Sequence, residues 1–405
     1  MRVGRNGVGW AGRVGALAAL FLGALALRPQ LVGLGPLLPQ VQDDLRLTHA
    51  VAGLLGTIPV LCMGLFAPLA AFVSGRFGSR RAVALCLALI AGFGLLRAIA
   101  PGALPVIALT FGVGLGMGLA GALLPVAVKE RFADRPAFAT GVYATGIQLG
   151  SAASAAFAVP IATATGGWRG ALVAFSLLAV VLFVVWFALT GGGPAHRRSP
   201  ARPPRLPWRS GVGWVLVAVF GLLSVIYYGL TAWLPNAYVE RGWLAGDAGA
   251  LIAAMNALAL PASLLVPWLA DRAGSRRFYM ATAAVAQIVA LLGFVLVPDA
   301  AWLWILLVGP AGGILFSLIL TLPLDVSDRP DQVGAVAGLM FGAGYALSAV
   351  APVGLGAARD ATGSFVASLW VLVVVSGLLL LASLTLTHER LHRGIGREHP
   401  LEVDA

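Results

Sequence analysis

The sequence predicts an all-α membrane protein with twelve transmembrane helices arranged as two six-helix repeats. Hydrophobic residues make up 60% of the 405 residues and charged residues only 11%, with a mean hydropathy of +0.93. Soluble domains carry roughly 25% charged residues, so this chain has too little charge to cover a water-facing surface. The apolar residues fall into runs of about 20 to 25 residues, which suit a tilted membrane-spanning helix. Motifs in the first half of the chain also recur in the second half.

Twelve apolar runs are long enough to cross a bilayer. Backbone groups in lipid must bond within their own segment, and the alternation of barrel strands is absent, so we expect helices. The predicted spans are 14–39, 50–74, 82–100, 103–127, 137–160, 168–190, 213–236, 248–270, 278–297, 301–324, 333–356 and 364–387. The first span follows three arginines and contains a signal-peptidase-like Ala-Leu-Ala, but its apolar run continues to Leu38. We therefore expect it to be retained as a span.

The longest polar gap divides the chain into two halves that resemble each other. The expected parts are an N-terminal six-helix half, 1–190, a proline- and arginine-rich cytoplasmic linker, 191–212, a C-terminal six-helix half, 213–387, and a cytoplasmic tail, 388–405. SGRFGSRR (Ser74–Arg81) follows the second span and ADRAGSRR (Ala270–Arg277) the eighth, and five of these eight positions match. Parallel repeats of this kind place a solute site between the halves, near the membrane midplane.

The placement of basic residues predicts the orientation. Of the 27 lysines and arginines, 21 fall on the side of the termini and only four in the opposite loops. This bias places both termini in the cytoplasm of a multi-pass protein of the cell (inner or plasma) membrane. The basic residues face anionic lipid, so the net charge of +11 does not require a nucleic-acid partner.

One arginine, Arg28, lies in the middle of a span without an acidic partner. All 16 acidic residues and all five histidines fall in loops or at the ends of predicted spans. A central arginine costs about 2.5–3.5 kcal/mol on insertion scales. A solute anion could supply the missing charge, because the guanidinium fork suits carboxylates and other planar oxyanions. The alternative is a structural arginine bonded to carbonyls that Pro29 or Gly33 leaves free.

Other polar residues mark helix faces that should line a path or join helices. One face of the seventh span carries Ser224, Tyr227, Tyr228 and Thr231, and a similar face of the eleventh span carries Tyr345. Arg97 lies near the outer end of the third span and either contacts solute or snorkels to the surface. The predicted substrate-binding residues are Arg28, Arg97, Gln148, Tyr227, Tyr228, Asn256, Phe341 and Tyr345.

Catalytic or cofactor chemistry is not indicated by the sequence. Cys62 and Cys86 lie in apolar runs and form neither a disulfide pattern nor a metal-ligand spacing. The glycines of the fourth span lack the strand-turn-helix context of a phosphate loop, so they do not indicate nucleotide binding. We therefore expect neither an enzyme, a cofactor nor a bound metal.

The loop PWLADRAGSRR (Pro267–Arg277) resembles the signature that the major facilitator superfamily carries after its second and eighth spans. With twelve spans and the half repeat, this resemblance covers the whole chain. In that family the loop contributes to a cytoplasmic gate. The implied gating residues are Arg76, Arg80, Asp271, Arg272 and Arg276. The first copy departs from the signature, since Gly75 replaces its acid. A purely topological role as positive-inside anchors is the alternative.

Three further segments resemble the cyanate and nitroimidazole transporter subgroup of that family. They are LRPQLVGLGPLLPQVQDDL (Leu27–Leu45), AVAGLLGTIPVLCMGLFAPLA (Ala50–Ala70) and LLPVAVKERF (Leu123–Phe132). We therefore expect a monomeric secondary transporter that moves a small anionic or polar solute across the lipid bilayer by alternating access. The solute is a cyanate-like anion, a carboxylate or a nitro-heterocycle, and coupling to a proton or a counter-anion stays open. The alternatives are a drug/proton antiporter of the same fold, a membrane sensor that binds without transporting, and a membrane-embedded enzyme.

Overall fold

The computed structural model describes residues 10–132, 136–190, 206–273, 276–326 and 330–386, and within these ranges all regular structure is helical. Among these described residues, twelve helical segments are long and apolar enough to cross a membrane, which confirms the predicted fold class. The first half contains α1 (Trp10–Leu25), α2 (Pro29–Val32), the 3-10 helix η1 (Gly35–Leu37), α3 (Leu38–Leu45), α4 (His49–Phe66), η2 (Ala67–Leu69), α5 (Ala70–Phe77), α6 (Ser79–Ile99), α7 (Ala103–Arg131), α8 (Pro136–Ala164) and α9 (Trp168–Leu189). The second half contains α10 (Gly211–Val239), α11 (Ala245–Ala273), α12 (Arg276–Leu296), η3 (Pro298–Ala300), α13 (Ala301–Asp325), α14 (Pro330–Ser348), α15 (Val350–Thr362) and α16 (Phe365–Leu384).

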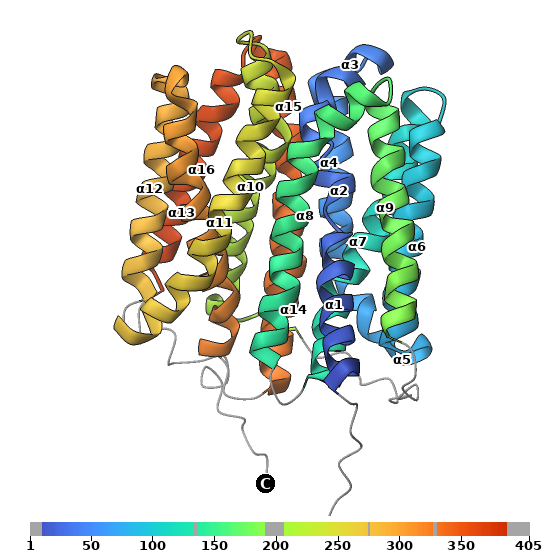
Figure 1. Ribbon diagram of the computed structural model, residues 1–405. Helices are drawn as coiled ribbons and strands as arrows, with labels where there is room; N and C mark the ends of the chain where they lie inside the picture. The colour runs from blue at the N-terminus through green and yellow to red at the C-terminus, as the bar shows by residue number, and fades with distance from the viewer. Residues whose placement is uncertain (1–9, 133–135, 191–205, 274–275, 327–329, 387–405) are drawn as a thin grey trace, which may run out of the picture.

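The two halves lie side by side, and their long helices run roughly parallel to one axis (Figure 1). Across the boundary α8 packs against α11, and α4 packs against α14 and α15. Close backbone approach explains several glycines here, since a Cβ on Gly64 would lie 2.6 Å from the carbonyl oxygen of Gly342. The expected linker, 191–212, lies largely outside the described residues, so its boundaries stay a prediction.

The first span is a broken helix, which differs from the single helix expected over 14–39. Its apolar run extends over Arg13–Leu45, and α1 stops at Leu25 before the chain continues through α2, η1 and α3. Pro29, Pro36 and Pro39 lack the amide hydrogen that a continuous helix needs, which explains the interruptions. Arg28 lies in the first break. Unwound backbone at membrane depth is tolerated where protein or a cavity surrounds it.

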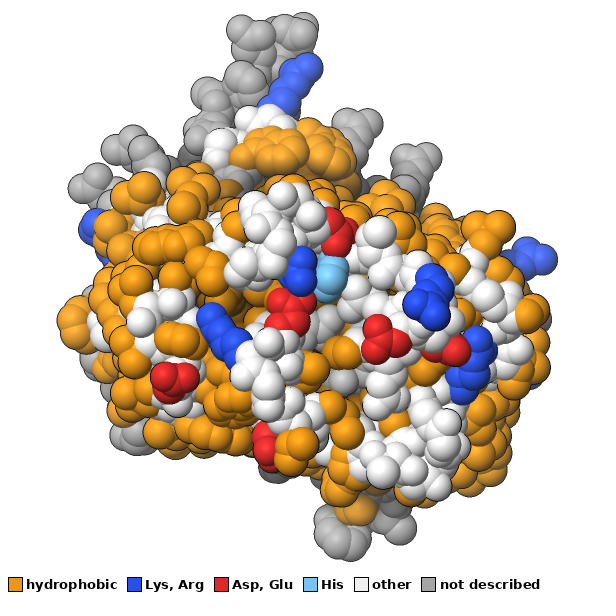
Figure 2. All heavy atoms as spheres, turned by 90° about the horizontal axis from the view of Figure 1, so that it is seen from above, with side chains coloured by type: hydrophobic (Ala, Val, Ile, Leu, Met, Phe, Trp, Pro, Cys, Tyr) orange, Lys and Arg blue, Asp and Glu red, His pale blue; other side chains and the backbone are white. Residues whose placement is uncertain are grey.

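Polar contacts join the halves at the end of the bundle that carries α3 and α15, which is seen from above in Figure 2. His49 Nδ1 lies 2.7 Å from Asp360 Oδ1, and Asp360 also accepts hydrogen bonds from the backbone of His49 and Ala50. Arg359 Nε donates to Glu240 at 3.0 Å, and His49 Nε2 lies 3.5 Å from the same carboxylate. We call His49, Glu240, Arg359 and Asp360 the outer cluster, after the orientation that the basic residues predict. It holds the first half against the second at this end.

Candidate functional site

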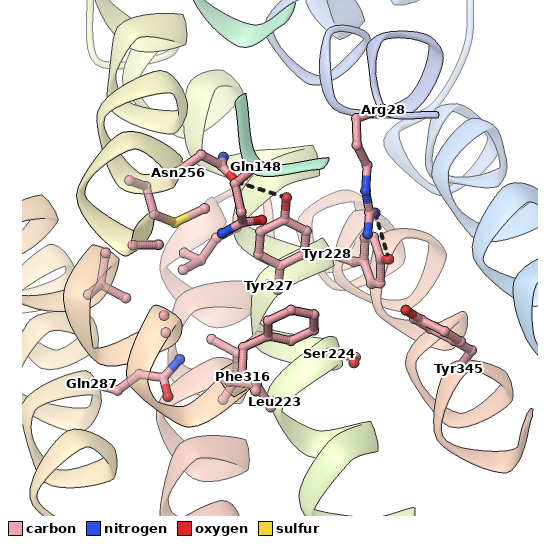
Figure 3. A pocket seen from close by; sticks show the side chains of 18 residues that line it. Arg28, Gln148, Leu223, Ser224, Tyr227, Tyr228, Asn256, Gln287, Phe316 and Tyr345 are labelled. Atoms are coloured by element: carbon pink, nitrogen blue, oxygen red, sulfur yellow. Dashed lines mark hydrogen bonds between the residues drawn. The ribbon is translucent and has the colours of Figure 1, made fainter. Parts of the chain in front are cut away.

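A cavity lies between the two halves, below the outer cluster and beside the break in the first span. It encloses about 690 Å³, counting the space at its mouth. Its walls come from α8 of the first half and from α10 to α14 of the second, together with the broken segment. Six of the eight predicted binding residues line it: Arg28, Gln148, Tyr227, Tyr228, Asn256 and Tyr345. Figure 3 shows these side chains converging from several helices.

Arg28 carries the charge of this cavity. Its side chain is 8% exposed, and Nη1 donates to the hydroxyl of Tyr228 at 3.1 Å. Among the described residues no carboxylate pairs with Arg28, and no aspartate, glutamate or histidine lines the cavity. The Tyr345 hydroxyl also interacts with Arg28. A guanidinium has five N–H donors, so these neutral phenols leave it able to bind an anion in bidentate fashion.

Aromatic rings surround Arg28 on the side of the second half. The rings of Tyr227 and Tyr228 are 5.1 Å apart and nearly perpendicular, and Tyr345 lies 6.4 Å from Tyr228. Phe341 does not line the cavity but stacks on Tyr345 at 6.3 Å and packs edge-on against Phe220. Phe341 thus supports a cavity residue rather than contacting the cavity, which differs from its predicted role.

Amide side chains lie on the opposite side of the cavity from Arg28 (Figure 3). Tyr227 donates its hydroxyl hydrogen to Asn256 Oδ1 at 3.0 Å, and Asn256 Nδ2 donates to the carbonyl of Ile252. The sequence reasoning missed Gln287, which is 2% exposed and lines the cavity. Within the described residues its Oε1 has no hydrogen-bond partner, a deficit that costs about 1–3 kcal/mol. A glutamine midway along the ninth apolar run was a signal for it.

Arg97 lies in the interior of the first half and does not line the cavity. The side chain is fully buried, so it neither snorkels nor reaches a cavity solute, in contrast to both expectations. It donates to the backbone oxygen of Gln30 at 3.0 Å, to Gln30 Oε1 at 2.6 Å and to Thr110 Oγ1 at 3.3 Å. Gln30 Nε2 in turn donates to Ser176 Oγ at 2.7 Å. Arg97 thus ties α6 to the broken segment that begins at Arg28.

The structure describes the side chains of three predicted gating residues, and these three do not line the cavity. Arg80 donates to Thr190 Oγ1 and to the carbonyl of Phe187, both in the first half. Arg76 lies over the ring of Phe77, and Arg276 donates to Thr321 Oγ1 at 3.3 Å. The side chains of Asp271 and Arg272 lie outside the described set. The role of this loop as a gate therefore stays a prediction.

A metal site is not evident in the described part of the chain, where no three histidine, cysteine, aspartate or glutamate side chains come together. Among the described residues, two hydrogen-bond networks contain the buried arginines. One is open to the cavity at Arg28, and the other is enclosed around Arg97.

Known proteins resemble this chain along most of its length. A model of the Major Facilitator Superfamily matches residues 17–352. The 2-nitroimidazole transporter of Escherichia coli (strain K12) is 30% identical over 92% of this chain and 95% of its own length. The cyanate transport protein CynX of the same organism is 31% identical over 86% and 91%. The uncharacterized transporter YycB of Bacillus subtilis (strain 168) is 29% identical over 89% and 88%.

Solved structures show the same fold at lower sequence identity. The inward-facing, unoccupied crystal structure of a bacterial homolog to the human lysosomal transporter Spinster aligns with a TM-score of 0.76 and 16% identity, covering 93% of this chain and 98% of that one. A point mutant of the nucleoside transporter NupG aligns with a TM-score of 0.73 and 13% identity, covering 92% and 99%. This chain belongs to the Major Facilitator Superfamily and is a multi-pass membrane transporter rather than an enzyme.

Proposed function

We propose that this transporter moves a small anionic or polar solute by alternating access, with Arg28 as the group that binds the solute's negative charge. One observation carries the proposal: Arg28 is buried in a cavity wall, and among the described residues its side chain pairs with a neutral phenol rather than a carboxylate. An arginine in a span without a counter-ion is costly unless a wet cavity or a ligand stabilises it. The solute would supply the missing charge.

The named relatives support a small planar solute. Cyanate and 2-nitroimidazole appear in the names of two relatives, and a probable nitrate/nitrite transporter, NarK2 of Mycobacterium tuberculosis, is 26% identical over 88% of this chain. These solutes are flat and carry oxygen atoms that a guanidinium fork can bind. We infer the same chemical class here. We also propose that the transporter works as a monomer in the inner or plasma membrane with both termini in the cytoplasm.

The contacts between the halves support alternating access. The outer cluster joins the halves at one end, and Asn236 Nδ2 donates across the same boundary to Gln42 Oε1 at 3.1 Å. Opening at this end would have to break these bonds. We propose that the loop around Asp271 forms the corresponding gate at the other end. Cysteines introduced above and below the level of Arg28 should change their labelling rates in opposite directions when solute is added. Parallel changes at both levels would contradict the mechanism.

Two alternatives follow from the same fold. A drug/proton antiporter for cations would be expected to carry an acidic residue in its cavity, and no acid lines the described cavity. A sensor that binds without transporting would give solute binding but no exchange. Counterflow of labelled solute in proteoliposomes separates a transporter from a sensor.

The experiment that tests the proposed site measures the melting temperature of the purified protein with cyanate, nitrate or benzoate. Wild type should be stabilised by at least one of these anions. Arg28→Ala should lose that shift, and Arg28→Lys should lose most of it, because a point charge does not replace a planar fork. A normal shift in Arg28→Ala would contradict the assignment of Arg28.

A further inference from the structure

The cavity has a second polar end, away from Arg28. A three-atom anion such as cyanate, bound to Arg28, would make no contact with it. Arg28 lies at one side with Tyr228, and Gln287 lies at the opposite side, with Tyr227 and Phe316 between them (Figure 3). A small anion held by the guanidinium would not touch the amides across this space. The chain nevertheless keeps polar side chains there, in apolar helices where such groups are unfavourable without partners.

Gln287 is the strongest sign that the second end binds something. It is 2% exposed, lines the cavity, and its Oε1 has no partner among the described residues. Buried amides in folded proteins are almost always hydrogen-bonded. The oxygen and nitrogen of this amide can be exchanged by turning the group over. In both orientations one of the two atoms is buried without a described partner and the other lies near the cavity. A solute group that both donates and accepts would bond the amide group that faces the cavity in either orientation.

Asn256 adds a second amide at this end. Its Oδ1 accepts from the Tyr227 hydroxyl at 3.0 Å, and its Nδ2 donates to the Ile252 carbonyl at 2.9 Å. These bonds fix the amide, and the described contacts use only one of the two hydrogens on Nδ2. The side chain is thus oriented by the protein and keeps a donor available.

The wall beside the amides leaves room for a ring. A Cβ on Gly312 of α13 would meet no atom within 4 Å, although Gly312 lines the cavity. Its neighbours Gly309 and Gly313 instead lie close to the backbone of α11, so their lack of a side chain serves helix packing. The aromatic side chains of Tyr227 and Phe316 supply the apolar surface that a flat ring prefers.

We propose that the cavity binds an elongated planar solute with an anionic group at Arg28 and a neutral hydrogen-bonding group, such as a hydroxyl, at the amides of Gln287 and Asn256. This inference rests on the proposed function and narrows its solute class. An aromatic acid with a ring hydroxyl is the simplest molecule of this kind. Cyanate and benzoate each match only the charged end.

Isothermal titration of the purified full-length protein tests the proposal with benzoate, 3-hydroxybenzoate, 4-hydroxybenzoate and cyanate. In wild type the better hydroxybenzoate should bind about 3- to 10-fold more tightly than benzoate, the contribution of one good hydrogen bond. In Gln287→Met the hydroxybenzoate should bind about as tightly as benzoate, so that the ratio of the two affinities falls to about one. The affinities for benzoate and cyanate should stay within about threefold of wild type. Thr282→Val, at an exposed position on the same helix, is the matched control and should keep the full advantage.

A second variant tests the same end without removing a polar group. Gly312→Ala adds a methyl into open space, so the fold should tolerate it. It should weaken the hydroxybenzoates by about 5-fold or more through steric overlap and leave cyanate within about twofold. A lower folded fraction would lower the fitted stoichiometry of the titration and leave the affinity unchanged, so the comparisons with wild type hold for both variants.

The outcomes separate this inference from the proposed function. Equal affinities for benzoate and both hydroxybenzoates in wild type would overturn the two-ended solute. So would an unchanged ratio in Gln287→Met together with unchanged hydroxybenzoate binding in Gly312→Ala. In either case, anion binding that is lost in Arg28→Ala would leave the proposed function standing. Binding of every anion to Arg28→Ala as to wild type would overturn both.

Discussion

Two buried arginines of the first half, Arg28 and Arg97, lie in opposite surroundings. Arg28 borders the cavity and donates to one phenol, that of Tyr228. Arg97 is enclosed by protein and donates to three oxygens, two of them on Gln30. Neither has a carboxylate partner among the described residues. Both would be costly in a bilayer, yet of the two only Arg28 lines a space that a solute could enter.

The difference shows which partners a buried guanidinium finds when no acid is present, although Nε of Arg97 has none among the described residues. The sequence offered a structural role for Arg28, in which it bonds to carbonyls freed by Pro29 or Gly33. The structure shows this kind of contact at Arg97 instead. In a regular helix the Leu34 amide would donate to the Gln30 carbonyl, but here it donates to Leu31 O. The Gln30 carbonyl accepts instead from Arg97 Nη2 at 3.0 Å. Arg97 therefore stabilises the broken span, and Arg28 is left available at its edge.

Removing the Arg28 guanidinium should have the largest effect, and it should fall on binding. In Arg28→Ala we expect anion affinity to drop by about 100-fold or more, since truncating one partner of a buried charged contact costs about 2–5 kcal/mol. Stability without solute should stay near that of wild type, because the lost bond to Tyr228 is offset by the removal of an uncompensated charge. Titration calorimetry and thermal unfolding measure the two quantities. A large loss of stability with retained binding would reverse the roles assigned to the two arginines.

Removing Arg97 should show the opposite pattern. Arg97→Met leaves both Gln30 oxygens without their donor, so we expect a loss of about 2–4 kcal/mol in stability. Anion affinity, measured on the folded fraction, should fall less than about 10-fold, as expected for a residue that positions Arg28 through the backbone of the broken span. Gln30→Leu should cost less stability in the Arg97→Met background than in wild type, because the bonds between the two residues are then already lost and only the Gln30 contacts to α9 remain. Additive losses would show that the contact is not the source of the stability.

A smaller change to the same network acts through Gly94. A Cβ there would lie 2.5 Å from Ser176 Oγ and 2.6 Å from Gln30 Nε2. Gly94→Ala should therefore displace Gln30 and destabilise the protein by about 1–3 kcal/mol, the usual cost of overpacking. Gly92→Ala is the matched control on the same helix, because a Cβ at Gly92 would meet no atom within 4 Å. Thermal unfolding of both variants checks the prediction, and equal melting temperatures would contradict it.

The sequence predicted the fold well because lipid imposes strong patterns. Span length and the repeated loop are visible without contacts, and the twelve predicted spans correspond to twelve apolar helical segments among the described residues. The orientation that the basic-residue bias indicates stays a prediction. The pattern of Arg28, Tyr227, Tyr228 and Tyr345 also identified side chains that converge on one cavity. The placement of Arg97 was not predictable, because an arginine near the end of a span is expected both when it snorkels to the surface and when it is buried inside. What distinguishes the two cases here is a tertiary contact: the helix is interrupted before Pro29, and both Gln30 oxygens accept hydrogen bonds from Arg97 of α6.

Acidic residues should matter least for solute exchange, because the cavity charge comes from Arg28 and no acid lines the described cavity. Moving a monovalent anion into a negative-inside cell costs about 2.3 kcal/mol per 100 mV, so accumulation needs a driving partner. The solute could bring its own proton, exchange for a counter-anion, or leave the cell down the potential. We therefore expect that no single aspartate, glutamate or histidine is essential for exchange, and that Asp271→Asn changes only the rate. Counterflow in proteoliposomes at several external pH values, with each acid neutralised in turn, measures this. Asp325 is the acid at the C-terminal end of α13. If Asp325→Asn abolished pH-dependent uptake while exchange continued, a carboxylate would carry the coupling proton, and none of the three routes above would account for the coupling.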